Sequence, residues 1–121
     1  MEVVSMVVND EFGVMQRIVG EFTRRKINIE TIVVGKCEIP GKARVVLGVN
    51  ERAMAEAAVN ALKQRVHDVI QIEILDETRH EAYALVSNGF GKARLIGSTK
   101  EVDSMIESSK PDKFIKAINA I

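Results

Sequence analysis

The sequence has few of the residues that usually dominate a protein core or a metal site. Its 121 residues include no tryptophan, one tyrosine and four phenylalanines, so the core must be built from aliphatic side chains. Cys37 is the only cysteine, which excludes a disulfide or a cysteine cluster within the chain. His67 and His80 have no partners at ligand spacing, and we expect neither a metal nor another cofactor.

Net charge and long apolar runs are absent as well. Seventeen Lys and Arg balance seventeen Asp and Glu, which argues against a nucleic-acid binder, since such proteins carry a basic surplus. No apolar stretch approaches the roughly 20 residues of a membrane span. The start Met1-Glu2-Val3 is unlike a signal peptide. We therefore predict no nucleic-acid or membrane partner and a cytoplasmic localisation.

The first 75 residues or so alternate between strand and helix periodicity. Strands are predicted at residues 3–8, 27–37, 43–49 and 69–75. Helices are predicted at residues 14–25 and 51–66, with Asn50 as the N-cap of the second. The order βαββαβ predicts a ferredoxin-like α+β fold, with both helices on one face of an antiparallel sheet. The second strand should be an edge strand that can pair with another chain.

The first predicted helix carries two features that need a structural explanation. Arg17, Glu21 and Arg25 follow one another at four-residue intervals, which predicts ion pairs along one face. Gly20 lies in the helix interior, where glycine costs roughly 1 kcal/mol relative to alanine. We expect close packing of the helix on the sheet as the compensation.

The patterns divide the chain into residues 1–76 and a C-terminal extension, residues 77–121. A hairpin is predicted from strands at 82–86 and 93–96, and the sequence from Ser98 to Glu101 fits a capping box that begins a helix. A further helix is predicted after Pro111. Its apolar side chains would be Phe114, Ile115, Ile118 and Ile121.

The loop from Asn9 to Val14 is the strongest candidate for chemistry. It leads into a helix N-terminus, whose unpaired N–H groups and positive dipole end suit a carboxylate. Gly13 would let a ligand approach the backbone. Asp10 could accept a hydrogen bond from an ammonium group, and Asn28 offers a donor and an acceptor. A free amino acid has both charges; in the alternative interpretation, Asp10 only caps the helix and Gly13 only makes a turn.

The same stretch resembles the opening of the small regulatory subunit of acetolactate synthase. That family shows an acidic or Asn-containing loop, then the pattern G-x-x-x-R-x-x-G-x-F, then N-I-E. This chain matches it with Gly13, Arg17, Gly20, Phe22, Asn28, Ile29 and Glu30. Residues 66–70 also resemble the entry to the family's fourth strand. The resemblance covers about residues 2–75 and implies an ACT domain.

The resemblance implies a regulatory function and not a catalytic one. ACT domains bind amino-acid effectors between two protomers, and their sheets pair edge to edge in a homodimer or higher homo-oligomer. The effector in this family is typically valine, leucine or isoleucine, and the regulated partner is the catalytic acetolactate synthase subunit. The implied effector site has one side made of Asp10, Phe12, Gly13 and Val14, and another made of Asn28 and Ile29.

Three features differ from the family pattern. Asp10 stands where the family commonly has Asn, and Lys26 replaces a usual Gly at the end of the helix. The extension after residue 76 is shorter than the family's second domain. These differences leave a second hypothesis, in which the chain is an interaction module that kept the ACT fold and lost effector binding.

Overall fold

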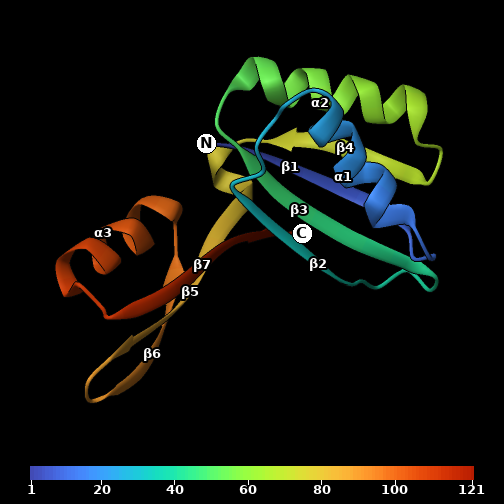
Figure 1. Cartoon of the computed structure of the whole chain (residues 1–121). Helices are drawn as coiled ribbons and strands as arrows, with labels where there is room; N and C mark the ends of the chain where they lie inside the picture. The colour runs from blue at the N-terminus through green and yellow to red at the C-terminus, as the bar shows by residue number, and fades with distance from the viewer.

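A four-stranded antiparallel sheet in the order β2-β3-β1-β4 organises the first part of the chain. The computed structural model describes residues 1–121. The strands of this sheet are β1 (Glu2–Asn9), β2 (Thr31–Lys36), β3 (Lys42–Val49) and β4 (Val69–Leu75). Helices α1 (Val14–Arg24) and α2 (Arg52–Arg65) lie together on one face of the sheet (Figure 1). This arrangement confirms the predicted ferredoxin-like α+β fold with β2 at an edge.

The main core lies between the sheet and the two helices and is almost wholly aliphatic. Alternate side chains of β1 point into it, because successive strand residues face opposite sides of a sheet. They meet Ile18 and Phe22 of α1 and Leu62 of α2, which are at most 1% exposed. Burial of each such side chain contributes roughly 1.5–3 kcal/mol. Phe22 is therefore the one aromatic anchor of a core that the composition predicts to be aliphatic.

The connection from α1 to β2 differs from the predicted strand over residues 27–37. Residues 27–30 form a loop, in which Ile27 is buried in the core and the polar side chains bind one another and the turn at Asn50. The Glu30 carboxylate accepts hydrogen bonds from the amides of Asn28 and Asn50, at 3.0 and 2.8 Å. Asn50 is thus engaged outside α2 and is not its N-cap. That position belongs to Glu51, which makes no side-chain cap.

Two predictions for α1 are corrected by its tertiary contacts. The Glu21 carboxylate pairs with Arg25 at 2.5 Å, as the spacing predicts, but Arg17 reaches Asp68 instead. The prediction that Gly20 packs closely on the sheet is wrong, since a Cβ built there would have no atom within 4 Å. Gly20 lies on the exposed outer side of the helix, away from the sheet.

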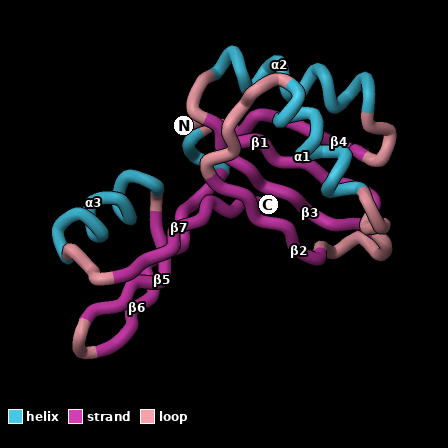
Figure 2. The backbone as a smooth tube through the Cα atoms, in the orientation of Figure 1, coloured by secondary structure: helices cyan, strands magenta, loops and turns pink.

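The C-terminal extension forms a second sheet. The short 3-10 helix η1 (Glu77–Arg79) leads into β5 (His80–Asn88) and β6 (Gly91–Gly97), a hairpin at the predicted place. Next come α3 (Thr99–Ser109) and β7 (Lys113–Ala120), and the sheet order is β6-β5-β7 (Figure 2). The hydroxyl of Ser98 caps α3 by accepting a hydrogen bond from the Glu101 N–H at 3.1 Å.

The predicted final helix after Pro111 is wrong, because this segment is strand β7. It pairs antiparallel with β5 from Lys113 to Ala120. Ile118 and Ala120 are buried while Ile115 is 68% exposed, which is the alternation of a strand. Apolar residues at these few positions fit either period. A short isolated helix is marginal in water, whereas β5 offers a full ladder of hydrogen bonds.

The extension covers part of the ACT sheet face that carries no helix. Val3, Val46 and Leu75 of that face pack in one cluster with Ile118 and Ala120 of β7. The C-terminus accordingly lies beside β2 and β3 (Figure 1), and the Ile118 N–H donates to the Thr31 hydroxyl at 3.4 Å. No helix of the chain has both the length and the apolarity to cross a membrane.

Lys26 generates a stability prediction, because it ends α1 with φ of 58°. A side chain in this left-handed conformation costs roughly 1–2 kcal/mol, and glycine avoids most of that cost. We expect Lys26→Gly to raise the free energy of unfolding by about 0.5–1 kcal/mol, allowing for the greater flexibility of glycine when unfolded. Urea denaturation measures it.

The matched control is Lys63→Gly, which makes the same substitution inside α2. It should lower the free energy of unfolding by about 1 kcal/mol. Equal losses in the two variants would contradict the assignment of strain to Lys26.

Candidate functional site

The loop between β1 and α1 is held by backbone contacts and leaves its side chains exposed. The Asp10 N–H donates to the Gly41 carbonyl at 3.0 Å, which ties the loop to the turn before β3. Gly13 occupies the N-cap position of α1 with φ of 84°, a conformation that favours glycine. Helix α1 has no side-chain cap. The interpretation in which Asp10 caps the helix is therefore wrong, while Gly13 does form the turn.

An uncapped helix start is a place where an anion can be bound. The first N–H groups of a helix have no partner within it, and the dipole adds a partial positive charge. The first turn of α1 also contains no acidic side chain that would compete for this charge. Asp10 and Phe12 beside it are exposed, Phe12 completely so. The loop thus combines an anion-binding helix end, a carboxylate and an aromatic ring.

A partly buried polar network lies beneath the loop and holds its base in place. Asp68, in the turn before β4, is only 3% exposed. Its carboxylate accepts hydrogen bonds from the Asn9 amide at 3.1 Å and from the Arg17 guanidinium at 2.5 Å. The side-chain amide oxygen Oδ1 of Asn9 in turn accepts a hydrogen bond from the Lys42 ammonium at 2.6 Å. The network joins β1, α1, β3 and the start of β4.

The hydrogen bonds to Asp68 have an electrostatic consequence. The amide of Asn9 and the guanidinium of Arg17, both donating to its carboxylate, lower the pKa of Asp68 below its ordinary value. Charge-assisted hydrogen bonds of this kind are stronger than neutral ones. The carboxylate is therefore ionised at neutral pH and holds Arg17 against the base of the loop.

The second predicted group, Asn28 and Ile29, lies at the other end of the sheet. Glu30 beside them donates its N–H to the Gly48 carbonyl at 2.8 Å, near the end of β3. The loop of Asp10 lies near the beginning of β3, since Asn9 is paired with Lys42. Strand residues rise about 3.3 Å each, so roughly 20 Å separates the ends of β3. One chain by itself does not bring the two groups together.

The network of Asn9, Lys42 and Asp68 was not predicted from the sequence. In the sequence, Arg17 is singled out only as part of the family pattern and as a cation on the helix surface. Asp68 is included only within the stretch that resembles the entry to the family's fourth strand. The position of Asp68 directly before an apolar strand could have indicated such a network, because an aspartate that becomes buried there needs a paired partner. Which partner it finds depends on the pairing of β1 with β4.

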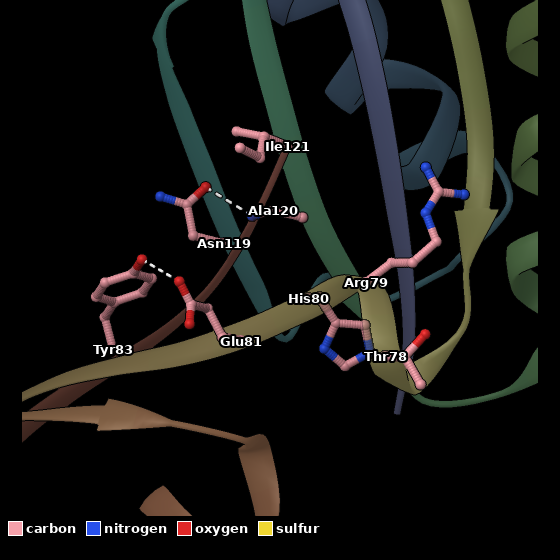
Figure 3. Close-up of a pocket in the computed structure, with 8 residues that line it drawn as sticks. All are labelled: Thr78, Arg79, His80, Glu81, Tyr83, Asn119, Ala120 and Ile121. Carbon is pink, nitrogen blue, oxygen red and sulfur yellow. Dashed lines mark hydrogen bonds between the residues drawn. The ribbon is translucent and has the colours of Figure 1, made fainter.

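A separate hollow of about 410 Å³ lies at the junction of the two sheets (Figure 3). Most of its polar groups are already paired with neighbouring protein groups. The Tyr83 hydroxyl donates to Glu81, Asn119 accepts from the Ala120 N–H, and Arg79 turns away to bind Glu73 on β4. The hollow therefore offers a ligand few free partners and is a weaker candidate than the loop.

The buried carboxylate of Asp68 generates a pH prediction. Its contribution to stability is complete above the unfolded pKa of about 3.9 and is lost as pH falls toward the lower folded pKa. We expect Asp68→Asn to lower the thermal midpoint markedly at pH 7. The difference from the wild type should shrink below about pH 4, where the carboxylate takes up a proton.

Differential scanning calorimetry across this pH range measures the effect, with Asp112→Asn, at an exposed carboxylate, as the control. A difference between the wild type and Asp68→Asn that stays constant down to about pH 2 would contradict an ionised role for Asp68.

Comparison with known proteins agrees with the resemblance seen in the sequence. A family model described as the AHAS small subunit-like ACT domain matches residues 4–71. The chain is 37% identical over 75 residues to a probable acetolactate synthase small subunit of Methanothermobacter thermautotrophicus, over 61% of this chain and 44% of that protein. It is 26% identical over 99 residues to the acetolactate synthase small subunit of Haemophilus influenzae, over 82% of this chain and 59% of that protein.

The fold is also shared with solved structures. A crystal structure of the acetolactate synthase small subunit from Thermotoga maritima superposes with a TM-score of 0.83 at 21% identity, covering 99% of this chain and 95% of that one. The ligand-free regulatory subunit of aspartate kinase from Thermus thermophilus gives a TM-score of 0.55 at 16% identity, over 89% and 66% of the two chains. At these identities the likeness concerns the fold alone.

The curated relatives are longer than the part that this chain matches, which is about half of their length. They are named as small subunits of acetolactate synthase, which agrees with the prediction of a regulatory and not a catalytic function. The family model covers more than half of the chain and includes the loop, α1 and the sheet except for its first two and last four residues. The chain belongs to the AHAS small subunit-like ACT domain family.

Proposed function

We propose that the protein is a dimeric regulatory module that binds a branched-chain amino acid and controls an acetolactate synthase catalytic subunit. The observation that carries this proposal is the start of α1, which Gly13 leaves uncapped beside the exposed Asp10 and Phe12. The family supports the proposal, since the matched relatives are named as acetolactate synthase small subunits. A cytoplasmic localisation stays a prediction.

The chemistry of the loop suits a free amino acid with an apolar side chain. The ligand carboxylate would bind the N–H groups at the start of α1, as anions do at helix N-termini. The ligand ammonium would face the Asp10 carboxylate, which keeps the two negative charges apart. Phe12 would supply an apolar surface for the side chain of valine, leucine or isoleucine. Gly13 lets the ligand approach the backbone because it has no Cβ.

A second copy would complete this site through the β2 edge. Edge strands carry unpaired backbone groups that can pair with another chain. On β2, Ile32 and Val34 are also 39% and 49% exposed, although they lie on the helix side of the sheet. If two β2 strands pair antiparallel, the start of one lies beside the end of the other. Asn28 and Ile29 of one copy then approach the Asp10 loop of its partner.

A site built in this way provides a route to regulation. A ligand that contacts both protomers favours the arrangement in which the two halves fit, and it shifts the population toward that arrangement. Any catalytic subunit that prefers the same arrangement is then coupled to the ligand by linkage. The roughly 20 Å that separates the two halves within one chain is what makes the dimer necessary.

Thermal unfolding in the presence of each of the twenty amino acids tests effector binding. Valine, leucine or isoleucine should raise the midpoint, because a ligand that binds only the folded state stabilises it by about 2.7 kcal/mol at one hundred times its Kd. Asp10→Ala should remove the shift, and the control Asp112→Ala should keep it. Absence of a shift with every amino acid at millimolar concentration would refute effector binding.

The second function is an interaction module without an effector, and the specific observation that favours it is the charge of Asp10. An aspartate places a negative charge close to the ligand carboxylate, where the family commonly has Asn. We expect Asp10→Asn to create a valine-dependent rise of the midpoint if the site has lost its ligand. Co-purification with an acetolactate synthase catalytic subunit, with and without valine, separates the two functions.

A further inference from the structure

The second sheet has one covered face and one bare face. Helix α3 packs on one side, where Val102 is buried against Ala82 and Ala84 of β5, and no helix lies on the other side (Figure 2). The bare face carries the alternate residues of all three strands. Its large apolar side chains are Tyr83, Leu85, Ile96 and Ile115, which are 38%, 43%, 59% and 68% exposed.

The strand register fixes how these side chains are arranged. Tyr83 on the central strand lies between Ile96 and Ala117. One step toward the hairpin tip, Leu85 lies between Arg94 and Ile115. The bare face is therefore an apolar patch two rows deep, with the large Ile115 and the small Ala117 side by side on β7.

The two ends of the bare face differ in charge. Toward the hairpin tip, Lys92 and Lys113 flank Ser87, and Arg94 lies in the next row. None of these three cations takes part in an ion pair of the chain. The other end carries the Glu81 carboxylate, which is paired in register with Asn119. The face is thus basic at one end, apolar in the middle and acidic at the other end.

We propose that this bare face binds the same face of a second copy of the chain. A two-fold axis across the strands would lay one face on the other with the strand directions reversed, as in an isologous interface. Each Ile115 would then lie over the small Ala117 of the second copy, and Leu85 over Tyr83. The same rotation brings each Glu81 toward Lys92 and Lys113 of the second copy. The same rotation places Ile96 over Arg94, and the other contacts of this arrangement are complementary in size or in charge.

The area of the face limits how strong the contact can be. Seven-residue strands at about 3.3 Å per residue and three strands about 4.8 Å apart give a face of roughly 300 Å². A stable dimer usually needs about 800 Å² per partner. The contact therefore strengthens the association of copies that also pair elsewhere, or joins dimers into tetramers. The bare face shares no residue with the effector site proposed at the Asp10 loop.

Sedimentation equilibrium of the full chain over a range of concentrations tests the proposal. Ile115→Glu should weaken self-association at least ten-fold, because it places a carboxylate in the middle of the apolar patch. The matched control is Phe90→Glu, at a fully exposed phenylalanine of the hairpin tip outside the face. Circular dichroism of each variant checks that the exposed substitution leaves the fold intact.

A charge exchange tests the orientation of the two faces. Glu81→Lys should weaken self-association about three-fold, and the addition of Lys113→Glu should restore it, because the pair is remade with the charges reversed. Equal association of the wild type and Ile115→Glu would overturn the proposal, as would equal weakening by Phe90→Glu or a wild type that is monomeric throughout. The valine-dependent thermal shift, measured on the same variants, reports separately on the effector site.

Discussion

The carboxylate of Asp68 is the contact on which the arrangement around the first loop depends. It is buried, and it binds Asn9 at the end of β1 and Arg17 near the start of α1. A buried charge of this kind is tolerated only when it is paired and hydrogen-bonded. Through Asn9 the network extends to Lys42 at the start of β3. Hydrogen bonds around this one side chain thus link three strands and a helix. They lie directly beneath the loop whose exposed groups suit an amino acid.

The same loop shows why a stable scaffold and an available site can coexist. The backbone of the loop is tied down by Gly41 and by the turn at Gly13. The side chains of Asp10 and Phe12 are exposed and α1 has no side-chain cap, although the Val14 N–H donates to the Glu11 carbonyl at 3.3 Å. A helix end that is fixed in place but uncapped keeps its capacity for an anion. The remaining part of the site would come from another copy, because residues 28–30 lie at the far end of the sheet.

The two faces of the first sheet have different roles in the fold. One face holds the core with α1 and α2, and the other is shared between exposed polar side chains and the C-terminal extension. Strand β7 covers the apolar end of that second face through Ile118 and Ala120. The extension is therefore attached by a common cluster of buried side chains, and its own bare face points elsewhere. Both sheets keep a surface that suits association with further copies.

The order of the first six elements, the edge position of β2 and the family of the first 75 residues or so could all be predicted from the sequence. Local periodicity carried this information, because the spacing of Val14, Ile18 and Phe22 belongs to a helix and the β-branched runs belong to strands. The family pattern around Gly13 and Arg17 pointed to the loop. These features depend on residues close together in the chain. The partner of Arg17, the exposure of Gly20 to solvent and the strand at Lys113–Ala120 depend on the folded chain and were not predicted.

The physical reason is the range of the interactions involved. Arg17 could reach Glu21 or Asp68, and the choice depends on a contact across 51 positions of the chain. The last segment fits two periods and became a strand because β5 offered it an unpaired edge. Local patterns fix local conformation, whereas long-range pairing selects among partners that the sequence leaves equivalent.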